Sequence, residues 1–446
     1  MQVKIEKLVF GGQGLARSDG QVIFVWGGLP GEEVEIKVLK KKKNFVEGVV
    51  INVLSASPDR VKPAEEHFLS CSPWQTIGFE KENEWKKTIA EETYSRLAGI
   101  KDLNLEIVSG TEEYGYRNKM EYNFTAGKNG GVSLAFHHRG THDLYEVEKC
   151  VLADKKIQES SAQIVNILNT NQVPLNVLKS LIVRSDKKGV AAVLFVTNRE
   201  FLNIYPELST IDDLVGWQVY FSNPFSPASV PTELIGQNGK TELDYILNGV
   251  KLSCGLLSFF QINPSIFEET LKDIGQHLSS GPARNATHSV ARRHAFGKAN
   301  GGQAGGRVVD YYSGVGAIGL ALHDKYKEAV LIEENREAAE FAEMNIKKNG
   351  FKNVKVVNSL SETAKAEIGE DDIVILDPPR TGLHKDFTKE LINSRPKKII
   401  YLSCGLDTHA RDISVLSLIY KPVFWKLYNF FPHTPHIEGL CVLERK

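Results

Sequence analysis

The stretch Val308-Val-Asp310-Tyr-Tyr-Ser-Gly314-Val-Gly316-Ala-Ile-Gly319 joins a short apolar run to a glycine-rich turn. Its glycines have the spacing G-x-G-x-x-G, and a helix-like stretch, Ala317–His323, begins within it. Glycine allows the backbone to turn tightly and to approach a ligand closely. A strand, a glycine turn and a helix in this order predict the cofactor-binding end of an α/β domain.

Three later apolar runs are each followed directly by a polar motif, as the first run is. Strands that alternate with helical stretches form a parallel sheet, and ligands bind beyond the carboxyl ends of its strands. We therefore expect a Rossmann-like α/β domain in which the polar motifs share one crevice. The runs and their motifs are Ala329–Ile332 with Glu333, Ile373–Leu376 with Asp377-Pro-Pro-Arg380, and Ile399–Leu402 with Ser403-Cys404-Gly405.

The motifs narrow the choice of cofactor. An acid in the position of Glu333 accepts hydrogen bonds from ribose hydroxyls, which fits both NAD and S-adenosylmethionine. In Asp377-Pro-Pro-Arg380 the prolines remove two N–H donors, so carbonyls and a carboxylate face the crevice. Amino- and base-methylating enzymes use such an acid–proline loop, whereas dehydrogenases have no need of it. This loop favours S-adenosylmethionine.

Cys404 is the candidate nucleophile. It follows the strand Lys398–Ser403 and precedes a helix-like stretch, Asp407–Leu418. A helix N-terminus lowers the pKa of a thiol, and the end of a parallel strand places this thiol beside the cofactor. Cys254 and Cys441 stand in apolar contexts, where a cysteine usually acts as a small core residue.

A second reactive group is expected near the C-terminus. The segment Phe431-Pro-His-Thr-Pro-His-Ile-Glu438 lies just before the last expected strand, Leu440–Leu443. Covalent catalysis at Cys404 needs a base nearby. Glu438 is the candidate base, and either His433 or His436 is the candidate orienting group.

A chain of 446 residues has the length of about three domains. Residues 1–55 alternate β-type runs with glycine-rich turns and predict a small barrel. The run Lys40-Lys-Lys-Lys43 on its edge could meet phosphates, although a solvated turn explains it equally well. Residues 56–255 predict a central α+β domain, and residues 256–446 the Rossmann-like domain with a flexible insertion at 279–306.

The composition is that of an ordinary globular protein. The net charge is −1, and 42% of the residues are hydrophobic. No run approaches the roughly 18 apolar residues of a membrane helix, and the first residues lack the apolar core of a signal peptide. The five cysteines are scattered and odd in number, which favours a reducing compartment. We therefore expect a cytoplasmic protein.

As a set, the motifs resemble the RNA 5-methyluridine (uracil-C5) methyltransferase family, and the similarity spans nearly the whole chain. The N-terminal unit looks like a TRAM domain, and Ser313 stands where many relatives have a cysteine. The motifs that carry the resemblance are Tyr116-Arg-Asn-Lys-Met-Glu121, Ser258-Phe-Phe-Gln261-Ile-Asn263, Asp310-Tyr-Tyr312-Ser-Gly-Val-Gly316, Glu333, Asp377-Pro-Pro-Arg380, Ser403-Cys404 and His433-Thr-Pro-His-Ile-Glu438.

The resemblance implies methylation of C5 of a uridine in RNA, with S-adenosylmethionine as the methyl donor. Cys404 would add to C6 of the base, and Glu438 would remove the C5 proton. The expected substrate is 23S ribosomal RNA, with the T-loop of tRNA as the alternative, and the protein is expected to act as a monomer. The residues that would hold the cofactor are Gln261, Tyr312, Glu333 and Asp377.

The chain departs from the family at one place. Many relatives hold an iron–sulfur cluster with four cysteines, but the corresponding stretch here reads Glu65-Glu-His-Phe-Leu-Ser-Cys71-Ser-Pro-Trp74-Gln75. Only Cys71 and the distant Cys150 remain, and two thiolates cannot supply four ligands. We expect no cluster and no metal, with Trp74 filling part of the space.

Other classes account for fewer of the motifs. A cytosine-C5 RNA methyltransferase would carry its cysteine in a Pro-Cys context on the strand of the Asp377 loop. A nicotinamide dehydrogenase would leave Cys404 and Glu438 without a role. A non-catalytic RNA-binding protein would be favoured by loss of Cys404, Asp377 or Glu333, and all three are present.

Overall fold

The computed structural model describes residues 1–200, 205–278, 305–364 and 367–446, so the expected insertion at 279–306 lies almost wholly outside the described residues. The chain divides into two compact units, and it enters unit 1 three separate times. The division into domains 1–55, 56–255 and 256–446 stays a prediction. Unit 1 comprises Met1–Tyr245, Cys254–Asn263 and Asn429–Ile437, and unit 2 comprises Ile246–Ser253, Pro264–Tyr428 and Glu438–Lys446.

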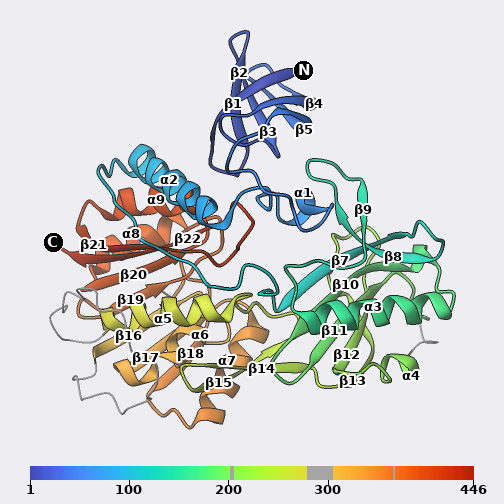
Figure 1. Cartoon of the computed structure of the whole chain (residues 1–446). Helices are drawn as coiled ribbons and strands as arrows, with labels where there is room; N and C mark the ends of the chain where they lie inside the picture. The colour runs from blue at the N-terminus through green and yellow to red at the C-terminus, as the bar shows by residue number, and fades with distance from the viewer. Residues whose placement is uncertain (201–204, 279–304, 365–366) are drawn as a thin grey trace. The chain divides into compact units, whose positions relative to one another are not determined.

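The N-terminal strands of unit 1 close into a barrel, as expected for residues 1–55 (Figure 1). The strands are β1 (Gln2–Leu8), β2 (Gly14–Ser18), β3 (Gln21–Trp26), β4 (Glu33–Lys41) and β5 (Phe45–Ser55), in the order β1-β2-β3-β5-β4. Pairing of β1 with β4 closes the barrel. Alternate side chains point inward, so Val3 and Ile5 pack with Ile23 and Val25. Strand β2 was not foreseen, because Gly14 reads as part of a turn.

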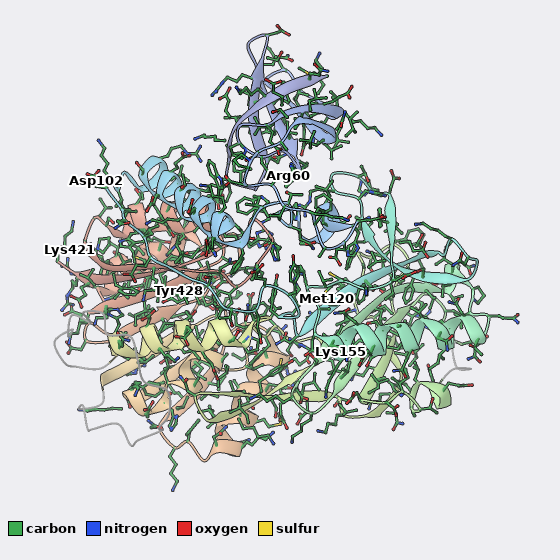
Figure 2. The ribbon with its side chains drawn as sticks, viewed as in Figure 1. Arg60, Asp102, Met120, Lys155, Lys421 and Tyr428 are labelled. Atoms are coloured by element: carbon green, nitrogen blue, oxygen red, sulfur yellow. The ribbon has the colours of Figure 1, made fainter. Side chains whose placement is uncertain are left out.

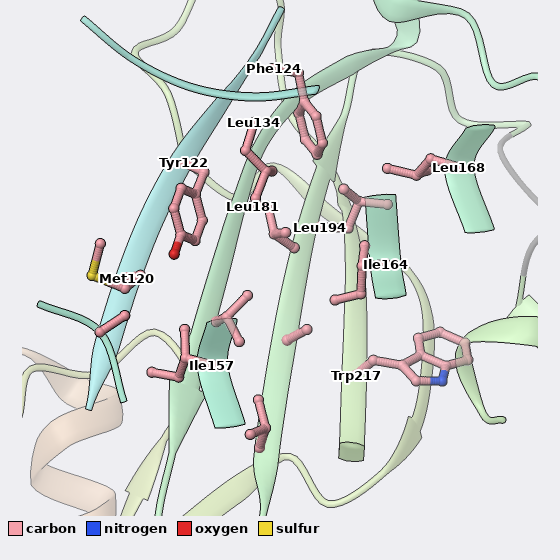
Figure 3. Packing of buried hydrophobic residues seen from close by; sticks show 14 of the residues in the cluster. Met120, Tyr122, Phe124, Leu134, Ile157, Ile164, Leu168, Leu181, Leu194 and Trp217 are labelled. Carbon is pink, nitrogen blue, oxygen red and sulfur yellow. The ribbon is translucent and has the colours of Figure 1, made fainter. Parts of the chain in front are cut away.

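The central part of unit 1 is an α+β layer. Its sheet has the order β13-β12-β11-β10-β7-β8-β9. Helix α3 covers it, and Ile157 and Ile164 of that helix pack over Tyr122, Leu181 and Leu194 of the strands (Figure 3). The elements are β7 (Lys119–Ala126), β8 (Val132–His137), β9 (Leu144–Val147), α3 (Lys155–Thr170), β10 (Leu178–Ser185), β11 (Val190–Val196), β12 (Leu214–Phe221) and β13 (Glu233–Gly239).

Shorter elements complete unit 1. Between barrel and sheet, Arg60 donates to Glu32 Oε2 at 2.7 Å and to the carbonyl of Gly27 at 2.6 Å (Figure 2). The long helix α2 ends at Gly99, whose φ of 67° is the left-handed conformation that closes many helices. These elements are α1 (Phe68–Cys71), α2 (Phe79–Ala98), β6 (Ile107–Val108), the 3-10 turn Leu175–Val177 and α4 (Tyr205–Leu208), and the hairpin β14 (Glu242–Leu247) and β15 (Val250–Gly255) leads into unit 2.

Unit 2 contains the Rossmann-like sheet, and its first strands confirm the four predicted runs. In order β18-β17-β16-β19-β20 the strands are parallel, and β22 then pairs antiparallel with both β20 and β21. The elements are α5 (Pro264–Leu278), β16 (Gly305–Tyr311), α6 (Ala317–Ala321), the 3-10 turn His323–Lys325, β17 (Tyr326–Glu333), α7 (Arg336–Asn349), β18 (Val354–Asn358), β19 (Ile373–Leu376), α8 (Lys385–Ser394), β20 (Lys398–Ser403), α9 (Leu406–Leu416), β21 (Tyr420–Tyr428) and β22 (Glu438–Arg445). Among the described helices of both units, none is long and apolar enough to cross a membrane.

Candidate active site

The polar motifs of unit 2 meet at one edge of its sheet. Tyr311 of β16 pairs with Ile332 of β17 and with Leu376 of β19, and Leu376 pairs with Tyr401 of β20. Residues that directly follow these strands therefore leave the sheet at the same edge. They are Tyr312, Asp377 and Cys404, with Glu333 as the last residue of β17.

Glu438 lies at the same edge, although it belongs to a strand that runs antiparallel to the others. Strand β22 runs antiparallel to β20, and Ser403 pairs with Gly439. Glu438, the first residue of β22, therefore stands beside the point where Cys404 leaves β20. Glu438 is 4% exposed and Cys404 is partly buried. The structure brings the predicted nucleophile and the predicted base onto neighbouring strands.

The Cys404 thiol is held protonated in this environment. Burial raises its pKa to about 11, and the nearby Glu438 and Asp377 add to the effect. Arg380 opposes the shift through its charge and a hydrogen bond. The lowering that we expected from the N-terminus of α9 is outweighed, because burial and two carboxyls act against the thiolate.

The carboxyl groups of this edge also favour their neutral forms. Burial raises the pKa of Asp377 to about 7. Burial and then Asp377 raise the pKa of Glu438 well above its usual range, and Arg380 opposes them. Oε2 of Glu438 is buried and finds no hydrogen-bond partner among the described residues. A carboxyl with a raised pKa can exchange protons near neutral pH, which suits a general base.

Glu333 shapes the glycine loop. Its Oε2 accepts a hydrogen bond from the Gly314 N–H at 2.8 Å, and its Oε1 accepts one from the Asn335 N–H at 2.8 Å. A Cβ on Gly314 would meet nothing within 4 Å, so the loop has open space beside it. A Cβ on Gly319 would lie 2.5 Å from Leu331 Cδ2. Position 319 is therefore a glycine because α6 packs closely on β17. An open loop beside a half-buried acid fits a nucleoside cofactor.

Tyr312 lies between this loop and a hollow in unit 2. Its φ is 62°, a conformation that is uncommon for a residue other than glycine and often marks a functional site. Its hydroxyl lies 2.8 Å from Ser361 Oγ. The hollow has a volume of about 660 Å³, and Tyr312, Glu334, Pro379 and His384 are among its lining residues. Cys404 and Glu438 are not among its lining residues.

Three candidate residues belong to unit 1. Gln261 is buried there, and its carbonyl accepts a hydrogen bond from Asn118 Nδ2 at 3.0 Å. The His433 ring stacks on Tyr114 at 4.4 Å between centroids, and the His436 ring packs against Phe431. Their expected roles toward the cofactor and the base stay predictions.

The sequence alone left two residues of this edge without a role. Arg380 ends the acid–proline motif, and its position next to Pro379 was the available signal. Asp310 is fully buried at the end of β16; its Oδ2 accepts the Gly319 N–H at 3.0 Å, and burial raises its pKa to about 8. No pattern in the chain distinguishes Asp310 from an ordinary strand-end acid.

Comparisons with known proteins agree with this geometry. The sequence profile of the tRNA (uracil-5-)-methyltransferase family matches residues 298–446, and the TRAM domain profile matches residues 1–51. An RNA methyltransferase of Clostridium tetani is 30% identical over 97% of this chain and 93% of its own. One of Fusobacterium nucleatum is 26% identical over 100% of this chain and 96% of its own.

A solved structure shows the same fold. The tRNA (uracil-54, C5)-methyltransferase of Pyrococcus abyssi, in complex with S-adenosyl-L-homocysteine, has a TM-score of 0.76 and 21% identity. The match covers 99% of this chain and 100% of that one. The fold is that of S-adenosylmethionine-dependent methyltransferases, preceded by a TRAM barrel. The chain belongs to the RNA (uracil-5-)-methyltransferase family, which confirms the resemblance of its motifs.

Proposed function

We propose that the enzyme methylates C5 of a specific uridine in 23S ribosomal RNA through a covalent bond between Cys404 and C6 of the base. The observation that supports the covalent mechanism is the pairing of Ser403 with Gly439, because it sets Cys404 beside Glu438 at one edge of the sheet. A nucleophile and a base on neighbouring strands suit a reaction that first adds to a ring and then removes a proton from it.

The first step makes C5 nucleophilic. The Cys404 thiol loses its proton to solvent, and Sγ forms a bond to C6 while the C5–C6 π electrons move into an enolate through C4 and O4. Arg380 assists, because its positive charge favours the thiolate. When bound, S-adenosylmethionine would supply an electrophilic methyl group for C5 and would leave as S-adenosyl-L-homocysteine.

The second step restores the aromatic ring. The Glu438 carboxylate takes the C5 proton, the electrons of that C–H bond re-form the C5–C6 double bond, and the C6–Sγ bond breaks. Cys404 leaves as a thiolate. The buried position of Glu438 supports this role, because a desolvated carboxylate binds a proton more readily.

For the cofactor, we propose that Glu333 accepts hydrogen bonds from ribose hydroxyls and that Tyr312, Asp377 and Gln261 complete the site. The open space beside Gly314 and the buried Asp377 support this placement. We further propose that the enzyme works as a monomer in the cytoplasm; no disulfide joins any two of its five cysteines, all of which lie in the described residues.

The target base must leave its stack to reach Cys404. The TRAM barrel would hold the surrounding RNA, and its exposed lysines at 40–43 support contact with phosphates. The second candidate substrate is the T-loop of tRNA, because the Pyrococcus abyssi enzyme acts on tRNA uracil-54. Mapping 5-methyluridine in ribosomal and transfer RNA, from cells with and without this protein, decides between them; a change confined to tRNA contradicts the ribosomal proposal.

Trapping with 5-fluorouridine RNA tests the mechanism. Fluorine at C5 cannot leave as a proton does, so the methylated adduct should persist and migrate as a protein–RNA complex on a denaturing gel. Cys404→Ala should lose the adduct and all methyl transfer but keep cofactor binding, whereas Cys254→Ala should behave as the wild type. Turnover by Cys404→Ala would contradict the proposal. Formation of the RNA adduct by Cys404→Ala would contradict it as well.

A further inference from the structure

Four side chains with metal-binding atoms converge in unit 1. Glu65, His67 and Cys71 come from the segment around α1, and Cys150 comes from the loop after β9. One ligand atom from each of them lies within 4.8 Å of all the others. In Figure 1, α1 lies beside the β8–β9 hairpin, and α1 contacts β8.

The separations between these ligand atoms match the edges of a zinc tetrahedron. Zn–S bonds of about 2.3 Å and Zn–N or Zn–O bonds of about 2.0–2.2 Å give edges of about 3.8 Å between sulfurs, 3.5 Å between sulfur and oxygen and 3.3 Å between nitrogen and oxygen. Here the two Sγ atoms of Cys71 and Cys150 are 3.9 Å apart. Glu65 Oε1 lies 3.5 Å from Cys71 Sγ, 3.6 Å from Cys150 Sγ and 3.2 Å from His67 Nε2.

His67 gives a second, independent sign of a ligand. The residue is 7% exposed, and its Nε2 has no hydrogen bond of acceptable geometry although it points at the cluster. Glu65 Oε1 lies 3.2 Å away but pairs with this nitrogen only when the imidazole is protonated, and a buried neutral nitrogen without a partner is costly. A metal ion would use its lone pair.

Surrounding groups hold the ligands in place. Glu65 Oε2 accepts the Val151 N–H at 2.9 Å, which leaves Oε1 directed at the other ligands. Gln75 Nε2 donates to Glu65 Oε1 at 3.1 Å and to Ser72 Oγ at 2.6 Å, and Ser72 Oγ lies 3.0 Å from Cys71 Sγ. Oriented outer groups of this kind are typical of metal sites.

We propose that Glu65, His67, Cys71 and Cys150 bind one Zn²⁺ in a closed tetrahedral site. Four protein ligands leave no open position, so the ion is structural: it joins α1 to the loop after β9. Two thiolates with a carboxylate and an imidazole suit zinc, whereas an iron–sulfur cluster requires more thiolates. The sequence pointed to neither cluster nor metal, because only the cysteines were counted as ligands.

Metal analysis of the whole purified protein tests the site. Protein made in zinc-supplemented medium should hold about one zinc ion per chain after gel filtration, with no stoichiometric iron or acid-labile sulfide. Cys71→Ser with Cys150→Ser should lose that zinc. Cys254→Ser, which changes a buried cysteine of the same unit, should retain it. Zinc-free wild-type protein, zinc retained by the double variant, or a Cys71–Cys150 disulfide in protein prepared under reducing conditions overturns the proposal.

Spectroscopy on the wild type keeps the proposal testable if the double variant does not fold. Co²⁺-substituted protein should show the intense visible bands of tetrahedral cobalt and thiolate-to-cobalt charge transfer. X-ray absorption at the zinc edge should give two sulfur scatterers at about 2.3 Å and two nitrogen or oxygen scatterers at about 2.0–2.2 Å. A shell of only nitrogen and oxygen means zinc bound elsewhere, and this result contradicts the assignment.

Discussion

Lys86 Nζ lies 2.7 Å from Glu82 Oε1, and neither side chain is exposed to solvent. The two residues stand one turn apart on α2. Glu82 also accepts the backbone N–H of His433 at 2.9 Å, and Lys86 donates to Asn429 Oδ1 at 2.7 Å. This buried ion pair therefore anchors the segment Asn429–Ile437, where the chain returns to unit 1 directly before Glu438.

Replacing one partner of this pair should be strongly destabilising. Lys86→Met leaves the Glu82 carboxylate buried without its cation, and such changes lower the free energy of unfolding by about 3–5 kcal/mol. Urea denaturation followed by intrinsic fluorescence measures the change. Lys87→Met removes a partly exposed lysine of the same helix and should cost about 1 kcal/mol or less. Equal effects of the two substitutions contradict the anchoring role.

Glu333→Ala should weaken S-adenosylmethionine binding. It removes the proposed ribose acceptor and the group that holds the Gly314 N–H, at about 1.5–3 kcal/mol for hydrogen bonds to a charged group. The dissociation constant measured by calorimetry should therefore rise about 10- to 150-fold. Glu340→Ala, on the exposed side of α7, should leave it unchanged. An unchanged affinity of Glu333→Ala contradicts this placement of the cofactor.

The rate of adduct formation should rise with pH. The thiolate of Cys404 is the reacting form, and with a pKa of about 11 its fraction grows about tenfold per pH unit below that value. Removal of an opposite charge shifts a pKa by about 1–3 units, so Arg380→Gln should slow trapping by 5-fluorouridine RNA by about tenfold or more. Arg380→Lys should recover part of the rate, and Arg336→Gln on the surface should have no effect. A pH-independent rate in the wild type argues against a thiol nucleophile.

Glu438→Gln should stop the reaction after methyl transfer. The amide keeps the shape of the side chain but cannot take the C5 proton, whereas addition of Cys404 to C6 does not need this base. An RNA adduct should accumulate with ordinary uridine, and mass spectrometry should find it already methylated. Turnover should fall about 10²–10⁴-fold. If Glu438→Gln turns over normally, or is inactive and forms no adduct, then another group removes the C5 proton.

Neutralising the lysine run of the barrel should weaken RNA binding in a salt-dependent way. Each lysine that contacts a phosphate contributes about 0.7–0.9 to the slope of log affinity against log salt concentration. Changing residues 40–43 to glutamine should therefore flatten the slope, and filter binding over a salt series measures it. Lys155→Gln, on the exposed face of α3, is the control. If the slope is unaltered, the lysines at 40–43 form a solvated turn and do not contact phosphates.

The sequence by itself determined the sheet and most of its reactive edge. Carboxyl ends of parallel strands meet at one edge, so the order of runs and motifs was enough to place Tyr312, Glu333, Asp377 and Cys404 together. The barrel strands were equally readable from their alternation, except for β2, where Gly14 concealed a strand start. These features depend on patterns of apolar, polar and glycine residues within short stretches of the chain.

Only the tertiary structure decided the features that depend on distant segments. The antiparallel return of β22 sets Glu438 beside Cys404, and burial among carboxyls raises the pKa of that thiol where a helix N-terminus alone would lower it. Cys150 likewise meets Cys71 across 79 positions of the chain. Local sequence does not encode such meetings, because packing of whole elements determines which side chains share a desolvated space and how strongly their charges interact.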